Sequence, residues 1–159
     1  MKIFKTVIAG IISLSAMAAA AEVSVGAGAS NVSGDGVDLT GAALDITGKI
    51  NDNFGWAVSS QIGGSESEGN FEIELDYFAA AKLRGGVSVG EGFLFLTAGY
   101  GVASISASAC YYGCASVDGT VNDFVYGVGF ETFFGEGSSW GLGLEYNAGG
   151  GDLDGLDQV

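Results

Sequence analysis

Apolar and polar residues alternate along most of the chain, and the longest alternating stretch is 71–84. Phe71, Ile73 and Leu75 open a series of apolar residues at every second position as far as Leu83, and the residues between them are largely charged. Successive side chains of a strand point to opposite faces, so this pattern predicts a strand with one apolar and one polar face. The same alternation recurs in six further stretches, at 22–29, 44–50, 54–62, 93–103, 124–134 and 140–147. The sequence therefore predicts an all-β protein with seven strands.

The face opposite the large apolar residues separates two architectures. A soluble barrel or sandwich turns its large apolar face inward, whereas a transmembrane barrel turns it toward lipid. Here the opposite face is mostly Gly, Ala and Ser with occasional charges of both signs, which suits the narrow interior of a small barrel. No stretch after the N-terminus approaches the roughly 18 apolar residues of a membrane helix. We predict an antiparallel up-and-down transmembrane β-barrel, and a soluble secreted β-protein is the alternative.

The first 21 residues have the layout of a secretory signal peptide. Lys2 and Lys5 precede a short apolar run at 7–17, and small residues follow at 18–21. This order of charge, apolar run and small residues is typical of an exported protein, with cleavage expected after residue 20 or 21. The barrel domain would then span 22–159 and would keep 3 basic against 19 acidic residues.

Charge and composition exclude several functions. The formal net charge is -14, so the chain offers no basic patch for nucleic acid. The sequence contains no His, which removes the commonest general base and metal ligand. We therefore predict neither an enzyme nor a cofactor.

The predicted connections alternate between short turns and longer acidic loops. The short ones are 49–53 and 134–138, and the long ones are 31–38, 63–70, 107–122 and the tail from 148. The link 85–92 is longer than a tight turn, unless 87–89 extends a strand. Bacterial outer-membrane barrels have short periplasmic turns and long external loops, so the acidic segments are expected outside the cell.

The chain resembles the small outer-membrane β-barrel family, the OmpA/OmpX-like "porin family" proteins. The resemblance is carried by the signal peptide and by 77–92 (YFAAAKLRGGVSVGEG), 95–104 (FLTAGYGVAS) and 140–146 (WGLGLEY). It implies an eight-stranded antiparallel barrel in the bacterial outer membrane, in contact with lipid and lipopolysaccharide and inserted by the barrel-insertion machinery.

One departure from the family pattern concerns the eighth strand. Single-chain bacterial barrels have an even number of strands, and an open edge in lipid is costly. Family members usually end on a strand with a C-terminal aromatic residue, whereas 151–159 (GDLDGLDQV) looks like an external loop. We expect truncation before strand eight. The alternatives are a missed strand or a closing strand at 115–120.

Cys110 and Cys114 lie in the third predicted external loop. Exported thiols meet an oxidising compartment, so these two residues are expected to form a disulfide that stiffens the loop. A redox or metal role is disfavoured because three residues separate the two Cys and the sequence has no His.

Nine charged residues are predicted to project into the barrel as a lumen charge network. They are Asp45, Lys49, Glu72, Glu74, Asp76, Lys82, Arg84, Glu131 and Glu145. Such a network can favour cations in a narrow pore or gate it. We favour the alternative, in which the charges satisfy one another inside a filled barrel.

The acidic tail offers a weaker metal hypothesis. Asp152, Asp154 and Asp157 resemble a Gly/Asp-rich calcium turn, but such turns bind in stacked repeats and only one copy is present. The sequence as a whole predicts a monomeric outer-membrane barrel with a structural or surface-interaction role toward an unknown extracellular ligand. A narrow cation-favouring diffusion pore is the alternative function.

Overall fold

The computed structural model describes residues 14–18, 23–34, 37–111, 113–134, 140–150 and 157–158, and these residues fold as antiparallel β-structure. Its long strands are β2 (Val23–Gly34), β3 (Val37–Lys49), β4 (Phe54–Ile62), β6 (Phe71–Val89), β7 (Gly92–Cys110), β8 (Cys114–Phe134) and β9 (Trp140–Gly149). Its short strands are β1 (Leu14–Ala18), β5 (Ser65–Glu68) and β10 (Asp157–Gln158). The predicted all-β class and the seven long strands are confirmed. Within the described part of the chain, no helix is long and apolar enough to cross a membrane.

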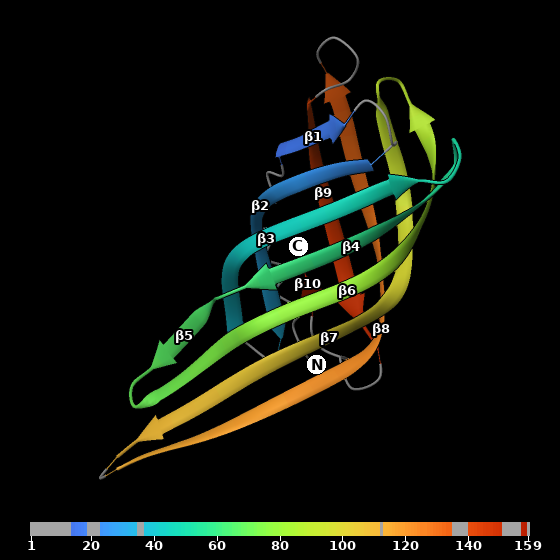
Figure 1. Cartoon of the computed structure of the whole chain (residues 1–159). Coiled ribbons are helices and arrows are strands. Elements are labelled where there is room, and N and C mark those ends of the chain that lie inside the picture. The colour runs from blue at the N-terminus through green and yellow to red at the C-terminus, as the bar shows by residue number, and fades with distance from the viewer. Residues whose placement is uncertain are drawn as a thin grey trace, which may run out of the picture.

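Neighbouring long strands pair in chain order, from β2 through β3, β4, β6, β7 and β8 to β9. Figure 1 shows that the resulting sheet curves around a common interior. Short turns at 50–53 and 90–91 join β3 to β4 and β6 to β7, and Gly90 supplies the positive φ of 63° that the second turn requires. We call the end with these turns the turn end. The opposite end, where β6, β7 and β8 extend furthest, is the loop end.

The place between β2 and β9, where an eighth strand belongs, is taken by two short segments. At the turn end β1 pairs antiparallel with both β2 and β9. At the loop end β10 does the same, with Gln158 opposite Val32 on one side and Asn147 on the other. Of the predicted signal peptide only β1 is described, and its cleavage site lies outside the described residues.

Several predicted connections prove to contain strand. The predicted loop 31–38 holds the end of β2 and the start of β3, and the loop 63–70 holds β5. The segment 107–122 is mostly the hairpin of β7 and β8. These strands are paired from Cys110 opposite Cys114 at the tip to Gly92 opposite Thr132. The segment 115–120 therefore belongs to β8, and it is no separate closing strand. Similarly, β6 runs to Val89, so the predicted link 85–92 is a turn of only two residues, 90 and 91.

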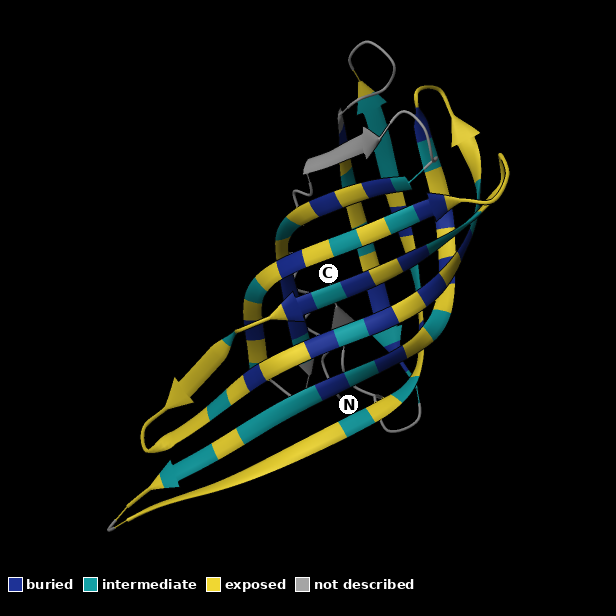
Figure 2. Cartoon of the chain, in the orientation of Figure 1, coloured by how far each residue is buried: buried dark blue, intermediate teal, exposed yellow. Residues whose placement is uncertain are grey.

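The outer surface of the barrel is apolar. Leu83, Leu96 and Phe124 on β6, β7 and β8 are 66%, 67% and 68% exposed. In Figure 2 exposed and buried residues alternate along the strands of the barrel body. Large apolar side chains thus point outward, the reverse of a soluble barrel. We call this surface the apolar belt: Val25, Leu44, Ile46, Val58, Leu83, Leu94, Leu96, Tyr100, Phe124, Tyr126, Val128, Phe130, Leu142, Leu144 and Tyr146.

The interior is filled on the loop side by an apolar plug. Leu75 is 0% exposed, and Phe78 from the same strand is buried beside it. The other buried members of the plug are Val32, Leu39, Ala80, Ala103 and Val125. Side chains from five strands therefore meet across the barrel and close its interior at this level.

A β-bulge on β6 reverses the faces of its first residues. The register between β6 and β7 shifts between Leu75 and Tyr77, so Asp76 is the extra residue. An extra residue moves every side chain before it to the other face. Leu75 therefore joins the plug, while Glu72 and Glu74 are exposed. The prediction of one uninterrupted alternation over 71–84 is wrong at this point.

The loop end extends into a protruding sheet of four strand segments, which we call the hairpin sheet: β5 with 71–75, 105–110 and 114–119. β5 pairs with the start of β6, which pairs with the end of β7 and through it with the start of β8. In Figures 1 and 2 these strands reach the lower left, well beyond the body of the barrel, and the start of β8 is exposed throughout.

Candidate functional site

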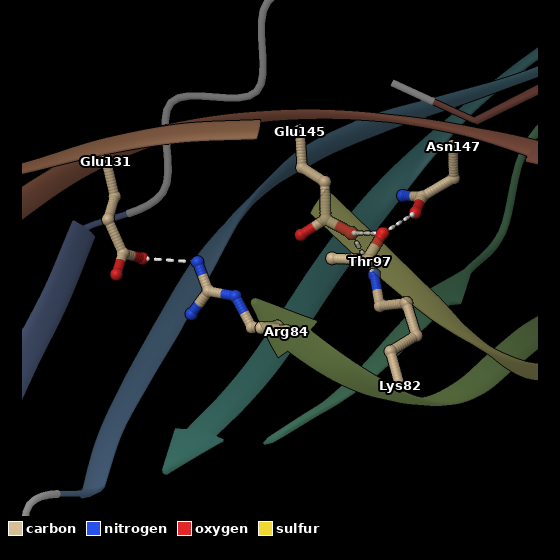
Figure 3. Close-up of polar contacts among 6 residues, drawn as sticks. All are labelled: Lys82, Arg84, Thr97, Glu131, Glu145 and Asn147. Carbon is tan, nitrogen blue, oxygen red and sulfur yellow. Dashed lines mark hydrogen bonds and ion pairs between the residues drawn. The ribbon is translucent and has the colours of Figure 1, made fainter. Parts of the chain in front are cut away.

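Two ion pairs cross the interior of the barrel on the turn side of the plug. Lys82 Nζ pairs with Glu145 Oε1, and Arg84 Nη2 donates to Glu131 Oε2 at 2.7 Å. Lys82 and Arg84 lie at inward positions of β6, and their partners lie at inward positions of β9 and β8, further along the same curved sheet (Figure 3). Because both cations are buried, each needs the carboxylate that faces it.

Two further contacts hold these ion pairs in position. The Arg84 guanidinium lies 3.7 Å from the centroid of the Phe95 ring, a cation–π contact. The Thr97 hydroxyl donates to Asn147 Oδ1 at 3.2 Å, next to Glu145 (Figure 3). We call Lys82, Arg84, Thr97, Glu131, Glu145 and Asn147 the ion-pair layer.

A small polar cavity of about 60 Å³ lies beside the ion-pair layer. Its wall includes both ion pairs, and Asp45 on β3 adds a third carboxylate. Hydroxyl groups of Ser24, Thr47 and Ser59 complete the polar side of the wall. The volume suits a few water molecules.

Four residues of the predicted lumen network lie elsewhere. Glu72 and Glu74 are exposed on the hairpin sheet because the bulge turns them away from the interior. Asp76, the bulge residue itself, is exposed and accepts hydrogen bonds from the Ser104 and Ser106 hydroxyls at 3.1 and 2.8 Å. Lys49 is exposed at the turn end of β3.

Lys49 instead forms a surface ion pair in the first turn. Its ammonium lies 2.8 Å from Asp52 Oδ1, and this contact lowers the pKa of Asp52 below its ordinary value. A pair this exposed contributes little to stability. The lumen network therefore reduces to Lys82, Arg84, Glu131 and Glu145, with Asp45 at the cavity wall.

The strand pattern alone does not identify Thr97 and Asn147 of the ion-pair layer, or Phe95, which contacts Arg84 beside it. All three occupy inward positions that the alternation of β7 and β9 does specify. Their contacts depend on which strands face each other across the barrel, and a single strand pattern does not contain that information.

Cys110 and Cys114 form a disulfide at the tip of the β7–β8 hairpin. Tyr111 lies next to it and is strongly exposed. The bond therefore sits at the point of the hairpin sheet furthest from the turn end, with no free cysteine in the described residues.

Most of the predicted calcium turn lies outside the described residues. Asp152 and Asp154 lie outside the described residues, and of Asp157 only the backbone pairing in β10 is described. Across the described ranges, no group of three or more His, Cys, Asp or Glu is arranged to hold a metal.

Comparisons with known proteins agree with this architecture. Two solved structures of Ail, the attachment invasion locus protein of Yersinia pestis, share the fold. The first, a complex with the heparin analogue sucrose octasulfate, is 16% identical with a TM-score of 0.57, and the second is 18% identical with a TM-score of 0.56. Both alignments cover 95% of this chain and 93% of Ail. A search of curated proteins finds no match.

The family model for the outer membrane protein beta-barrel domain matches residues 6–158. This match covers nearly the whole chain, and the outward apolar belt and the chain-order pairing of the strands fit it. The predicted resemblance and the bacterial outer-membrane location are confirmed, and a soluble secreted β-protein is excluded. The chain belongs to the outer membrane protein beta-barrel domain family.

Proposed function

We propose that this protein is an outer-membrane barrel with a filled interior that acts through its hairpin sheet as a surface-interaction protein. The observation that carries the proposal is the contrast between the two halves of the molecule. The interior is filled with a plug and paired charges, whereas the hairpin sheet is exposed and rich in acidic groups. The proposal assigns no catalytic step to the chain.

The filled interior argues against the alternative of a cation-favouring pore. A hydrated ion moving through the barrel would have to pass the ion-pair layer and then the plug, where Leu75 and Ala103 are both 0% exposed. Opening that path means separating paired charges and unpacking apolar side chains, which is costly. Side chains normally fill an eight-stranded barrel, and this interior follows that rule.

Planar-bilayer recording tests the closed interior. We expect the full chain to give no stable single-channel conductance in about 1 M KCl, because side chains fill its interior. A known porin is the positive control. A steady, cation-selective conductance that disappears when Glu131 or Glu145 is neutralised would favour the pore.

Removal of the β7–β8 tip tests the surface role. The cross-strand partners Ser106 and Asp118 can be joined by an Asn-Gly turn in place of 107–117, because a two-residue turn connects paired strand ends. This trimmed variant should stay heat-modifiable on gels, as a folded barrel does, while cells that display it lose attachment to proteins of an extracellular matrix. Equal attachment by the trimmed variant and the full chain would contradict a role for the hairpin.

The same arrangement supports a proposed orientation and the remaining partners. In this proposal the short turns at 50–53 and 90–91 lie in the periplasm, and the hairpin sheet lies outside the cell. The belt then contacts lipid, with lipopolysaccharide around the loop end, after the barrel-insertion machinery has placed the chain. We propose a monomer whose first 21 residues, β1 included, are removed on export. The plug and the ion pairs contain none of these residues and would still fill the interior.

A further inference from the structure

The two faces of the hairpin sheet differ in character. Cross-strand partners share a face, and Phe71 stands in one row with Ala109 and Ala115, while Ile73 stands in the next with Ala107 and Val117. The opposite face carries Ser and acidic side chains: Ser65, Ser67, Glu72, Glu74, Ser106, Ser108, Ser116 and Asp118. We call the first of these the plug-side face, because Ile73 and Ile105 on it pack against the apolar plug.

The plug-side face is apolar and open at its outer end. Phe71 is 65% exposed and Val117 is 72% exposed, although both lie beyond the barrel body. The lipid-facing belt is on the other side of these strands, since outward residues such as Leu96 share the face of Ser106 and Ser108. A contiguous apolar surface outside the lipid zone is typical of a binding surface.

Acidic groups border this apolar face. Glu68 stands opposite Phe71, and Glu66 stands opposite Ile73, so both carboxylates lie on the plug-side face at its β5 edge. Glu66 Oε2 accepts a hydrogen bond from the Asp38 backbone N–H at 2.8 Å, which fixes its position. The face therefore combines apolar rows with a negative border.

No positive side chain balances this border in the described part of the loop end. After residue 5 the sequence has only three basic residues, and all three are accounted for. Lys49 pairs with Asp52 at the turn end, while Lys82 and Arg84 are buried in the ion-pair layer. A polyanion, or a second acidic loop end from another copy of this chain, would be repelled.

We propose that the plug-side face of the hairpin sheet binds a basic amphipathic segment of a partner protein, in which apolar residues recur between Lys or Arg residues. The apolar residues would cover Phe71, Ile73 and Val117, and the cations would pair with Glu66 and Glu68. This inference rests on the proposed surface role and specifies its ligand. It predicts a class of ligand opposite in charge to the sucrose octasulfate bound in the Ail structure.

The test uses the full chain in zwitterionic nanodiscs and three fluorescent peptides. One peptide alternates Lys with Leu, the second replaces Lys by Glu, and the third replaces Leu by Ser. Empty nanodiscs measure the lipid contribution, which is subtracted. We expect saturable binding of the Lys-Leu peptide alone, weakened at least tenfold between 50 and 300 mM NaCl, an order-of-magnitude estimate from screening of exposed charges.

Matched variants locate the bound peptide. The double variant Glu66→Gln with Glu68→Gln should weaken binding about tenfold, because it removes exposed charge pairs. The double variant Phe71→Ser with Val117→Ser should also weaken binding about tenfold, because it removes apolar contact. Glu72→Gln with Glu74→Gln removes the same charge from the opposite face of the hairpin sheet and should leave binding unchanged.

Four results would overturn the inference. The first is equal loss of binding in the two Glu-to-Gln pairs, which shows a response to net charge alone. The second is binding of sucrose octasulfate in preference to the Lys-Leu peptide, and the third is self-association of the chain through the hairpin sheet. The fourth is failure of the Lys-Leu peptide to bind. If the peptide fails to bind but cells that display the trimmed variant still lose attachment, the surface role stands and only the ligand class is wrong.

Discussion

At the scale of single residues, the interior depends on charges that are paired across the barrel. Lys82 and Arg84 are adjacent inward residues of one strand, and each meets a Glu from a different strand. A buried ion pair need not stabilise a protein more than apolar residues would, but loss of one partner leaves an uncompensated buried charge. Single neutralising substitutions should therefore cost far more here than on the surface.

Glu131→Gln leaves Arg84 without its carboxylate, and we expect it to destabilise the barrel by about 3 kcal/mol. The measurement is the midpoint of urea unfolding in lipid vesicles, with the heat-dependent gel shift as the readout of the folded fraction. Asp118→Asn, which neutralises an exposed acid on β8, is the control and should change stability by less than about 0.5 kcal/mol. Similar losses in the two variants would show that the buried pair has no special role.

Glycine at position 99 is required by close packing between β6 and β7. A Cβ on Gly99 would lie 2.0 Å from the Ala81 carbonyl oxygen, a backbone atom with little freedom to move. We expect Gly99→Ala to destabilise the barrel by about 1–3 kcal/mol, the usual cost of overpacking. Gly119→Ala adds the same methyl group where nothing lies within 4 Å, so a comparable loss in this control would refute the packing explanation.

At the scale of elements, the sequence specified the strands well and the loop end poorly. The alternation identified all seven long strands and the outward face of most of them, because lipid and interior impose opposite requirements on neighbouring residues. It failed on β6, where a bulge at Asp76 reverses the face of 71–75. Both faces of 71–84 contain apolar residues, so the pattern on its own is compatible with either phase of the alternation.

Deletion of Asp76 tests the role of the bulge. Without the extra residue, 71–75 must turn over, so that Glu72 and Glu74 point toward the plug. We expect the hairpin sheet to lose its packing and to be cut faster by protease in the folded, vesicle-bound protein. Asp76→Ala keeps the bulge and removes only the hydrogen bonds from Ser104 and Ser106. It should be cut slowly, and rapid cleavage of this variant would assign the effect to the side chain.

The disulfide should act on the hairpin tip alone. Cys110 and Cys114 close a small ring at the end of two paired strands, far from the plug and the ion-pair layer. Small rings remove little chain entropy, so reduction should leave the heat-dependent gel shift unchanged. We expect faster proteolysis at 111–113 after reduction, detected by mass spectrometry. Loss of the gel shift on reduction would show that the barrel itself depends on the bond.

At the scale of the whole molecule, the barrel has three regions with different chemistry. The apolar belt surrounds the body, the interior is closed by paired charges and the plug, and the hairpin sheet presents acidic groups beyond them. The predicted lumen network combined residues from two of these regions. Lys82, Arg84, Glu131 and Glu145 belong to the interior, whereas Glu72 and Glu74 belong to the hairpin sheet and Asp76 to the bulge at its border.

The most direct test of this arrangement is labelling of single cysteines on intact cells with a membrane-impermeant maleimide. The background carries Cys110→Ser and Cys114→Ser, and one cysteine is placed at Val117, Leu96 or Asn51. We expect rapid labelling at 117, labelling at 51 only after the outer membrane is broken, and labelling at 96 only after the barrel is unfolded. Labelling at 96 as fast as at 117 on intact cells would contradict a lipid-facing belt, and with it the transmembrane barrel.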